Sequence, residues 1–271
     1  MNYVRTGKNR AVRHKKILAR IAEHGAQDVE VLAEHLAVST MTIRRDLEAL
    51  QQQGVLVRTH GGCIAQTPIM QEIAFSEKIG SNLAAKSAIA SYTAGVIEEG
   101  GCVYFDTGTT TLLVARSLSP RMRLSVVTNN IRAALELFGR PQVDVGVLGG
   151  ELAALSPDLL GLMAIEAMNV LRFDLALLGA DAIDVSTGEV AGVDQPSVAL
   201  SRQAWLRASR VLVLADSSKL GKTSRYVSGT LGDKATLITD GQANAAHLDS
   251  LRGLGIAVQV VPVKVHASNG T

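Results

Sequence analysis

A short stretch at residues 39–62, STMTIRRDLEALQQQGVLVRTHGG, constrains the fold of this chain more than any other part of it. Ser39 is a favourable N-cap for the segment that follows, because its hydroxyl can accept a hydrogen bond from a free N–H of a first helical turn. Ile43, Leu47 and Leu50 then recur at i, i+4 and i+7, the spacing of one buried helical stripe. The stretch therefore begins with an amphipathic helix.

The outer face of this helix carries side chains that suit DNA. With the apolar stripe inward, at about 100° per residue, the outward arc holds Thr40, Met41, Thr42, Arg44, Arg45 and Glu48. Arginine bonds guanine edges or phosphates, threonine bonds base edges, and methionine packs on a thymine methyl. All of these residues except Glu48 are predicted DNA contacts. The plainer alternative is the solvated face of a small helical bundle.

A second helical pattern precedes this helix and a β-prone run follows it. The earlier pattern starts after Asp28, which can cap it, and a three-residue turn joins it to the recognition helix, so the pair is a helix-turn-helix. Downstream, residues 55–57 favour a strand and residues 60–62 (HGG) favour a tight reversal. Arg58 and His60 would lie on this wing, and they complete the set of predicted DNA contacts.

These residues resemble the DeoR family of bacterial transcriptional regulators. The signature of that family's N-terminal domain is T-I-R-R-D-L followed by an R-x-H-G-G wing, and both are present, at residues 42–47 and 58–62. The resemblance implies a regulator whose partner is a double-stranded DNA operator. Because one recognition helix reads too few base pairs to select a genomic site, we expect a dimer or higher homo-oligomer on repeated half-sites.

Length and charge suggest two domains. At 271 residues the chain is long for one domain, and 47% hydrophobic content is enough for two cores. Residues 1–62 carry ten Lys and Arg against six Asp and Glu, net +4, which leaves −2 for the rest; this bias supports DNA binding only together with the motif. We expect a DNA-binding domain at 1–64 with its helix-turn-helix at about 27–46, a linker at 65–80 and an effector-sensing domain at 81–265.

Cysteine content and hydropathy bear on location and cofactors. Cys63 and Cys102 are the two cysteines of the chain, and neither has the spacing of a metal ligand, so we expect neither a metal site nor a cofactor. No apolar run is long enough to cross a membrane. We therefore expect a cytoplasmic protein without a membrane partner.

The remaining sequence predicts one bracing helix and an α/β domain. Residues 14–22 favour an amphipathic helix, and the cationic residues before it favour a solvated arm. After residue 84, helix-length segments alternate with β-prone runs at 102–105, 124–127, 143–148, 174–178, 210–214, 235–238 and 256–261. Such runs, nearly continuous in apolar residues, predict a largely parallel sheet covered by helices on both faces.

Polar loops follow several of these strands, and the ends of parallel strands gather in one crevice. The loop at 106–111, D-T-G-T-T-T, suits a phosphate, because backbone N–H groups at a helix N-terminus attract an anion. A purely structural Thr-rich cap is the alternative. We expect this loop to be exposed. Similar loops stand at 128–130, 148–152, 178–184 and 214–222.

The five loops, in this order, also resemble the C-terminal sensor domain of the DeoR family. That domain is similar in fold to ribose-phosphate isomerases and coenzyme A transferases, and it binds a phosphorylated sugar or related metabolite that weakens operator binding. By position, its effector-binding motifs fall on Asp106, Thr107, Gly108, Thr109, Thr110, Thr111, Thr128, Asn129, Gly149, Gly150, Glu151, Asp181 and Lys219.

Within this set, Lys219 would supply positive charge to the phosphate, and Asp181 and Asn129 suit sugar hydroxyls. For Asp181, and for Asp216 in the D-S-S-K motif, helix capping or turn chemistry is the alternative. We therefore expect a repressor of carbohydrate or related metabolic genes that a phosphorylated sugar-like effector releases.

One departure from the family concerns catalysis. Members often carry an acidic residue in the helix before the D-S-S-K strand, and related isomerases use an acidic base in that neighbourhood, but Leu200 stands there. We therefore expect no enzyme activity. A sugar-phosphate isomerase with an appended DNA-binding domain is the alternative, and product analysis on sugar phosphates would separate the two. A purely architectural DNA protein would leave the five polar loops unexplained.

Overall fold

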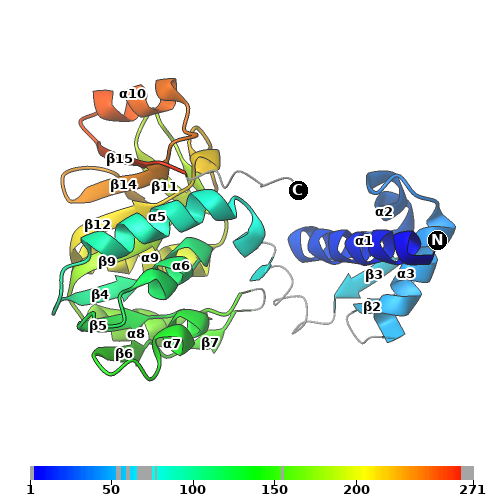
Figure 1. Ribbon diagram of the computed structural model, residues 1–271, viewed down its shortest axis with the longest axis horizontal. Helices are drawn as coiled ribbons and strands as arrows, with labels where there is room; N and C mark the ends of the chain where they lie inside the picture. The colour runs from blue at the N-terminus through cyan, green and yellow to red at the C-terminus, as the bar shows by residue number, and fades with distance from the viewer. Residues whose placement is uncertain are drawn as a thin grey trace, which may run out of the picture. The chain divides into compact units, whose positions relative to one another are not determined.

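The computed structural model describes residues 3–52, 56–58, 62–65, 75–76, 78–153 and 156–263. The chain forms two compact units, one of residues 1–81 with 154–156 and one of residues 82–153 with 157–271 (Figure 1). The linker expected at 65–80 lies largely outside the described residues. No helix within the described ranges is long and apolar enough to cross a membrane.

The first unit is a helix-turn-helix with a small antiparallel sheet. Its helices are α1 (Tyr3–His24), α2 (Val29–His35) and α3 (Thr40–Gln52), and its strands are β1 (Gln27–Asp28), β2 (Leu56–Arg58) and β3 (Gly62–Ala65), in the order β1-β3-β2. Apolar side chains from the three helices form one core, with Ile17, Ile21, Leu32, Ile43, Leu47 and Leu50 buried. The predicted inward stripe of the recognition helix is confirmed.

Two details of this unit differ from the sequence expectations. The cationic arm is helical, because α1 already begins at Tyr3; Lys and Arg are good helix formers and no proline interrupts them. Asp28 makes no side-chain bond to the start of α2 and instead lies in β1, opposite Gly62. A Cβ on Gly62 would lie 2.2 Å from the carbonyl oxygen of Gln27, so this glycine permits the close approach of β3 to β1.

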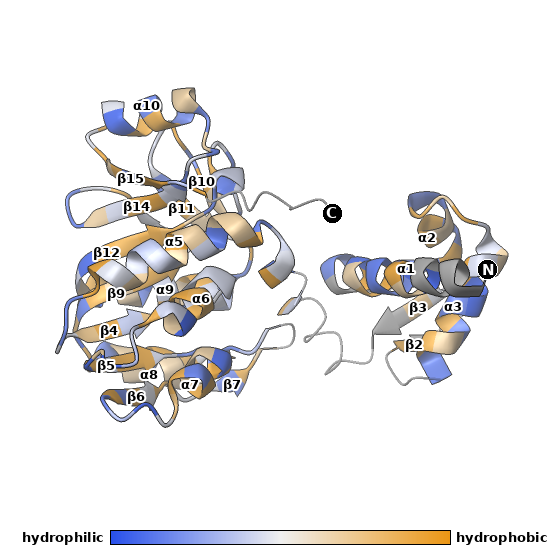
Figure 2. Ribbon diagram, in the orientation of Figure 1, coloured by the Kyte–Doolittle hydropathy of each residue, from blue (hydrophilic) through white to orange (hydrophobic). Residues whose placement is uncertain are grey.

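A seven-stranded parallel sheet forms the centre of the second unit, in the order β15-β14-β12-β9-β4-β5-β6. Each predicted strand overlaps one of its members, which are β4 (Cys102–Phe105), β5 (Leu124–Thr128), β6 (Val143–Val147), β9 (Phe173–Gly179), β12 (Ala208–Leu214), β14 (Ala235–Asp240) and β15 (Ala257–Val261). Figure 2 shows β9 and β12 as mostly hydrophobic, as expected for strands buried on both faces. The predicted α/β class is confirmed.

Helices cover both faces of this sheet (Figure 1). One layer holds α5 (Leu83–Val96), α6 (Thr109–Ser117) and α7 (Ile131–Leu137), and the other holds α8 (Leu162–Asn169) and α9 (Gln195–Arg207). Buried side chains of α8 and α9 share one apolar cluster with Tyr104, Leu178 and Val213 of the sheet, and Leu248 and Leu251 of α10 (Ala245–Gly253) join it.

Short strands that the sequence did not predict lie beyond the strand ends. They are β7 (Glu151–Leu152), β8 (Leu159–Leu160), β10 (Ala182–Ile183), β11 (Glu189–Gly192) and β13 (Tyr226–Thr230), and all of them pair antiparallel. A 3-10 turn, η1 (Ser217–Lys219), follows β12. Segments of two to five residues are too short to show a periodicity, so the sequence gives no signal for most of them.

The strand order contains one reversal. From β4 the chain proceeds through β5 to β6 on one side, and from β9 it proceeds through β12 and β14 to β15 on the other. In open α/β sheets, ligands bind outside the carboxyl ends of the strands at such a switch point. The ends of β4 and β9 therefore mark the candidate crevice, with the ends of β5 and β12 beside them.

Candidate functional site

The residues predicted to read DNA lie on the outer face of α3. Thr40, Arg44 and Arg45 are exposed, and Met41 is 56% exposed although it is a large apolar side chain. Among the described residues, neither Arg44 nor Arg45 has a hydrogen-bonding or ion-pair partner. Both guanidinium groups are therefore available to phosphates or base edges.

The start of α3 is fixed by the predicted cap. The backbone N–H of Thr42 donates to Ser39 Oγ at 3.2 Å, and the Ser39 and Thr42 hydroxyls lie 2.9 Å apart. The hydroxyl of Thr42 is therefore shared with the cap. Of the wing contacts, Arg58 ends β2 with its side chain outside the described structure, and His60 lies wholly outside it.

A buried carboxylate that the sequence analysis missed joins α3 to α1. Asp46 accepts from Arg13 Nε at 2.5 Å and Nη2 at 3.0 Å, and its Oδ1 lies 3.1 Å from His14 Nε2 and 3.6 Å from Arg10 Nε. The bond with Asp46 raises the pKa of the Arg13 guanidinium. Position 46 stands three residues after Ile43, so the helical period already placed it on the inward side.

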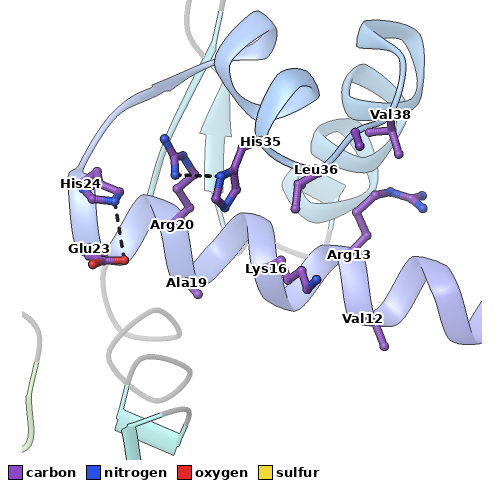
Figure 3. Close-up of a pocket in the computed structure, with 11 residues that line it drawn as sticks. Val12, Arg13, Lys16, Ala19, Arg20, Glu23, His24, His35, Leu36 and Val38 are labelled. Atoms are coloured by element: carbon purple, nitrogen blue, oxygen red, sulfur yellow. Dashed lines mark hydrogen bonds and ion pairs between the residues drawn. The ribbon is translucent and has the colours of Figure 1, made fainter. Parts of the chain in front are cut away.

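A groove of about 870 Å³ runs between α1 and the turn that leads into α3 (Figure 3). Its basic lining is largely paired within the unit. Arg20 Nε donates to Gln27 Oε1 at 3.1 Å, its Nη1 lies 3.2 Å from His35 Nδ1, and His24 Nε2 lies 3.6 Å from Glu23. We therefore assign no ligand to this groove.

In the second unit, the β4–α6 loop presents a free helix start. Gly108 is the N-cap of α6 at φ +125°, a conformation that favours glycine, and no side chain caps the helix. The backbone N–H groups of Thr109, Thr110 and Thr111 therefore have no intrahelical partner. Such groups, at the positive end of the helix dipole, suit an anion.

The hydroxyls of this loop are not exposed, contrary to the sequence expectation. Thr109, Thr110 and Thr111 are all buried. Thr111 Oγ1 donates to the carbonyl oxygens of Asp106 at 2.8 Å and Gly108 at 2.9 Å, because the chain must turn sharply between strand and helix. The Thr111 hydroxyl thus shapes the loop, and the backbone N–H groups at the start of α6 still have no intrahelical partner.

Asp106 lies at the base of the switch point with neutral donors around it. Its carboxylate accepts from the backbone N–H groups of Thr107 and Gly179 and from Ser201 Oγ at 3.0 Å. Burial, and to a smaller extent the charge of Asp158, raise the pKa of Asp106, these hydrogen bonds lower it, and the net pKa is about 7. Ser201 stands 95 residues along the chain in α9, so no local pattern predicted its contact with Asp106.

Thr128 and Asn129, at the end of β5, are fully buried and already engaged. Thr128 Oγ1 donates to the Phe105 carbonyl oxygen at 2.7 Å. Asn129 Oδ1 accepts from Tyr104 Oη at 2.8 Å, and its Nδ2 donates to the Leu159 carbonyl oxygen at 3.2 Å. These side chains fix the end of β5 against β4 and β8.

The predicted Gly149, Gly150 and Glu151 follow the edge strand β6, two strands away from β4. Gly150 has φ +130°, and a Cβ there would lie 2.3 Å from the Leu160 carbonyl oxygen, so the β7–β8 hairpin requires glycine. The hairpin returns toward β5, where the Leu159 N–H donates to the Asn129 carbonyl oxygen at 2.8 Å. These three residues therefore belong to a flap over β5.

Asp181 and Lys219 follow the two strands on the other side of the switch point. Asp181 is half-buried, and its Oδ2 accepts from the Val193 N–H at 3.3 Å. Lys219, also half-buried, ends η1, and its ammonium has no pairing partner among the described residues. Asp216 accepts from the Ser218 N–H at 3.1 Å, which is the turn chemistry considered as its alternative.

Family comparisons match both units. The DeoR-like helix-turn-helix domain matches residues 13–68, and the DeoR C terminal sensor domain matches residues 81–241. The HTH-type transcriptional regulator GlpR of Haloferax volcanii is 34% identical over 92% of this chain and 96% of its own length. The glycerol-3-phosphate regulon repressor of Escherichia coli K12 is 29% identical over 84% of this chain and 90% of its own length.

Among solved structures, ribose 5-phosphate isomerase A of Methanocaldococcus jannaschii is similar over 51% of this chain and 54% of its own, with 17% identity and a TM-score of 0.39. The two family models together cover most of the chain, and the relatives align along nearly its whole length. This chain belongs to the DeoR family of DNA-binding transcriptional regulators.

Proposed function

We propose that this regulator represses genes of carbohydrate or related metabolism, and that a phosphorylated, sugar-like effector bound at the switch point releases it from its operator. The observation that carries the proposal is the uncapped start of α6 behind Gly108. Its free N–H groups are oriented for an anion at the position where open α/β sheets bind ligands. A relative whose name refers to a glycerol-3-phosphate regulon is consistent with a phosphorylated effector.

The effector would be held by groups from several strand ends. The N–H groups of Thr109 to Thr111 would bind phosphate oxygens, and Lys219 would add positive charge. Asp181, half-buried beyond β9, would accept from sugar hydroxyls. The flap that contains Gly149, Gly150 and Glu151 would limit the size of the sugar.

On the DNA side, we infer that two or more copies bind repeated half-sites. Each chain contributes one recognition helix, whose exposed face offers Met41, Arg44 and Arg45. One such helix reads only a few base pairs, so a second copy is needed for specificity.

We further infer that the crevice binds its effector without converting it. Leu200, in the neighbourhood where related isomerases are expected to carry an acidic base, is fully buried in the apolar cluster that α9 joins. Its neighbour Ser201 points to Asp106 instead. Asp106 is 2% exposed and is surrounded by donors, so it is poorly placed to abstract a proton from a sugar carbon.

A thermal-shift panel tests the effector class. The full chain would be heated with pentose and hexose phosphates, with the matching free sugars and with inorganic phosphate. Stabilisation by one sugar phosphate, and not by its free sugar, is the expected result. Lys219→Ala should weaken this response, and Lys222→Ala, an exposed lysine three residues on, should not. A response to free sugars alone would contradict the phosphate site.

A further inference from the structure

The sheet of the second unit ends in an unprotected edge strand. Among the described residues, β6 pairs with β5 on one side over five consecutive residue pairs and with no strand on its other side. Its sequence, VDVGV, contains no lysine and no proline, its pairing contains no bulge, and Asp144 is its one charged residue among these edge-protecting devices. Val147 is exposed and Val145 is half-exposed. This edge can therefore accept another strand.

Exposed apolar side chains flank the same edge on both faces of the sheet. On the α7 face, Phe138, the C-cap residue of α7, is 81% exposed, and α7 packs beside β6. On the α8 face, the Met163 Cε lies 3.7 Å from the Cβ position of Gly149, just beyond β6, and Met163 is 66% exposed. Phe138, Val145, Val147 and Met163 form what we call the β6 edge.

The hydrogen-bond pattern shows which backbone groups of β6 face outward. The Leu148 N–H donates to Thr128 O, and the Leu124 N–H donates to Gln142 O. In a parallel ladder the bonding to one neighbour alternates, so even-numbered residues of β6 bond to β5. The N–H and C=O groups of Val145 and Val147 therefore point away from β5.

We propose that two copies of this chain pair antiparallel through the β6 edge, about a two-fold axis at Val145. In this register Val145 lies opposite Val145 of the second copy, and Val143 lies opposite its Val147. Asp144 lies opposite Gly146 of the second copy, so the charges of the two Asp144 residues are not directly opposed. Phe138 and Met163 border the junction on the two faces.

A second copy is the occupant that the rest of the molecule favours. The proposal rests on the proposed function, in which each chain brings one recognition helix and needs a partner to select an operator. An isologous contact uses the same patch on both copies, and a single strand that meets itself antiparallel satisfies that symmetry. The opposite edge, β15, is less exposed: its side chains from Val258 to Val261 are half-buried or buried, whereas Asp144, Gly146 and Val147 of β6 are exposed.

Proline substitutions at the two edges test the proposal. In Val145→Pro, an outward N–H is removed, so the β5 ladder is preserved while both symmetric bonds of the Val145 pair are lost. We expect the dimer dissociation constant of the full chain, measured by analytical ultracentrifugation, to rise about 10- to 100-fold. The matched control is Val258→Pro on β15, where the Gly241 N–H donates to Val261 O and even-numbered residues face outward. This control should leave the dimer intact.

A second variant keeps the test independent of folding. Phe138→Glu changes a side chain that lies mostly in solvent, so the fold should persist, and a charge beside the junction should also weaken the dimer. Wild-type-like dimers of Val145→Pro and Phe138→Glu would overturn the proposal, and dissociation of Val258→Pro alone would move the contact to β15.

A DNA-binding measurement distinguishes failure of the β6-edge proposal from failure of the proposed function. On a duplex selected by the wild-type chain, Val145→Pro should bind two half-sites about 100-fold more weakly yet keep its affinity for one half-site. A wild-type chain that is monomeric on its duplex would instead contradict the need for a second copy, whatever the β6 edge does.

Discussion

Each unit contains a buried carboxylate, Asp46 in the first and Asp106 in the second, and the two are stabilised in opposite ways. Asp46, in the DNA-binding unit, is surrounded by basic side chains: Arg13 binds it twice and His14 lies within hydrogen-bonding distance. Asp106, in the sensor unit, meets only backbone N–H groups and hydroxyls, with a second carboxylate, Asp158, nearby. Both side chains are about 2% exposed.

The difference follows from the electrostatics of burial. An opposite charge beside a buried carboxylate offsets the free-energy cost of burial, whereas a buried carboxylate without such a partner lowers that cost by taking up a proton. The pKa of Asp106 is accordingly about 7. Asp46 thus acts as a fixed joint that sets α3 against α1, and Asp106 is a protonatable group at the base of the ligand crevice.

The largest expected effect on stability comes from removing the Asp46 carboxylate, which links α3 to α1. Asp46→Ala leaves Arg13 and His14 without their acceptor and should destabilise the first unit by about 3 kcal/mol. Hydrogen exchange of peptides from α1 and α3 would report this as exchange about 100-fold faster. Operator affinity should fall with it. Unchanged exchange would mean that the apolar core alone holds α3 in place.

A smaller effect is expected from Asp106, whose contribution to stability should depend on pH. The folded carboxyl binds its proton up to about pH 7, whereas the unfolded carboxyl releases it near 3.9. Between these values the folded chain holds more protons, so stability falls as pH rises, by about 2 kcal/mol from pH 5 to 7. Asp106→Asn should lose this contribution to the slope.

Urea unfolding at several pH values, followed by fluorescence, would measure how the free energy of unfolding depends on pH. The single tryptophan of the chain, Trp205, is buried in the second unit and therefore reports that unit alone. The exposed Asp233→Asn variant is the control and should keep the wild-type slope. Parallel slopes for Asp106→Asn and wild type would show that Asp106 stays ionised.

The smallest effect should come from Arg10, at the exposed side of the Asp46 cluster. Arg10 lies 3.6 Å from Asp46, but its side chain is half exposed, so solvent screens the pair. Arg10→Ala should lower the stability of the first unit by no more than about 0.5 kcal/mol. The same hydrogen-exchange experiment would measure this change. A loss near that of Asp46→Ala would show that all three basic groups form one network.

Regular periodicity made much of this molecule predictable. The stripe of Ile43, Leu47 and Leu50 placed the recognition helix, and long apolar runs placed every strand of the parallel sheet. The sequence did not predict the two-residue strand β1 or the helical start of α1, because neither has an apolar period of its own.

The contacts that set the chemistry were harder to foresee. Ser201 meets Asp106 only because α9 packs across the end of β4, and Arg13 meets Asp46 only through the fold of the first unit. The glycine and threonines at 106–111 predicted the loop that we propose as a phosphate site, but the burial of those threonines depends on packing between layers. The spacing of residues along the chain does not predict such long-range contacts.

The central claim, that the crevice and the recognition helix are negatively coupled, is tested most directly by titrating the effector onto operator-bound protein. A coupling of about 2–3 kcal/mol would weaken operator binding about 30- to 150-fold. By reciprocity, operator DNA should weaken effector binding by the same factor. Lys219→Ala should hold its operator and fail to release it. An effector that strengthens operator binding, or a Lys219→Ala chain that is released at the wild-type effector concentration, would contradict the account.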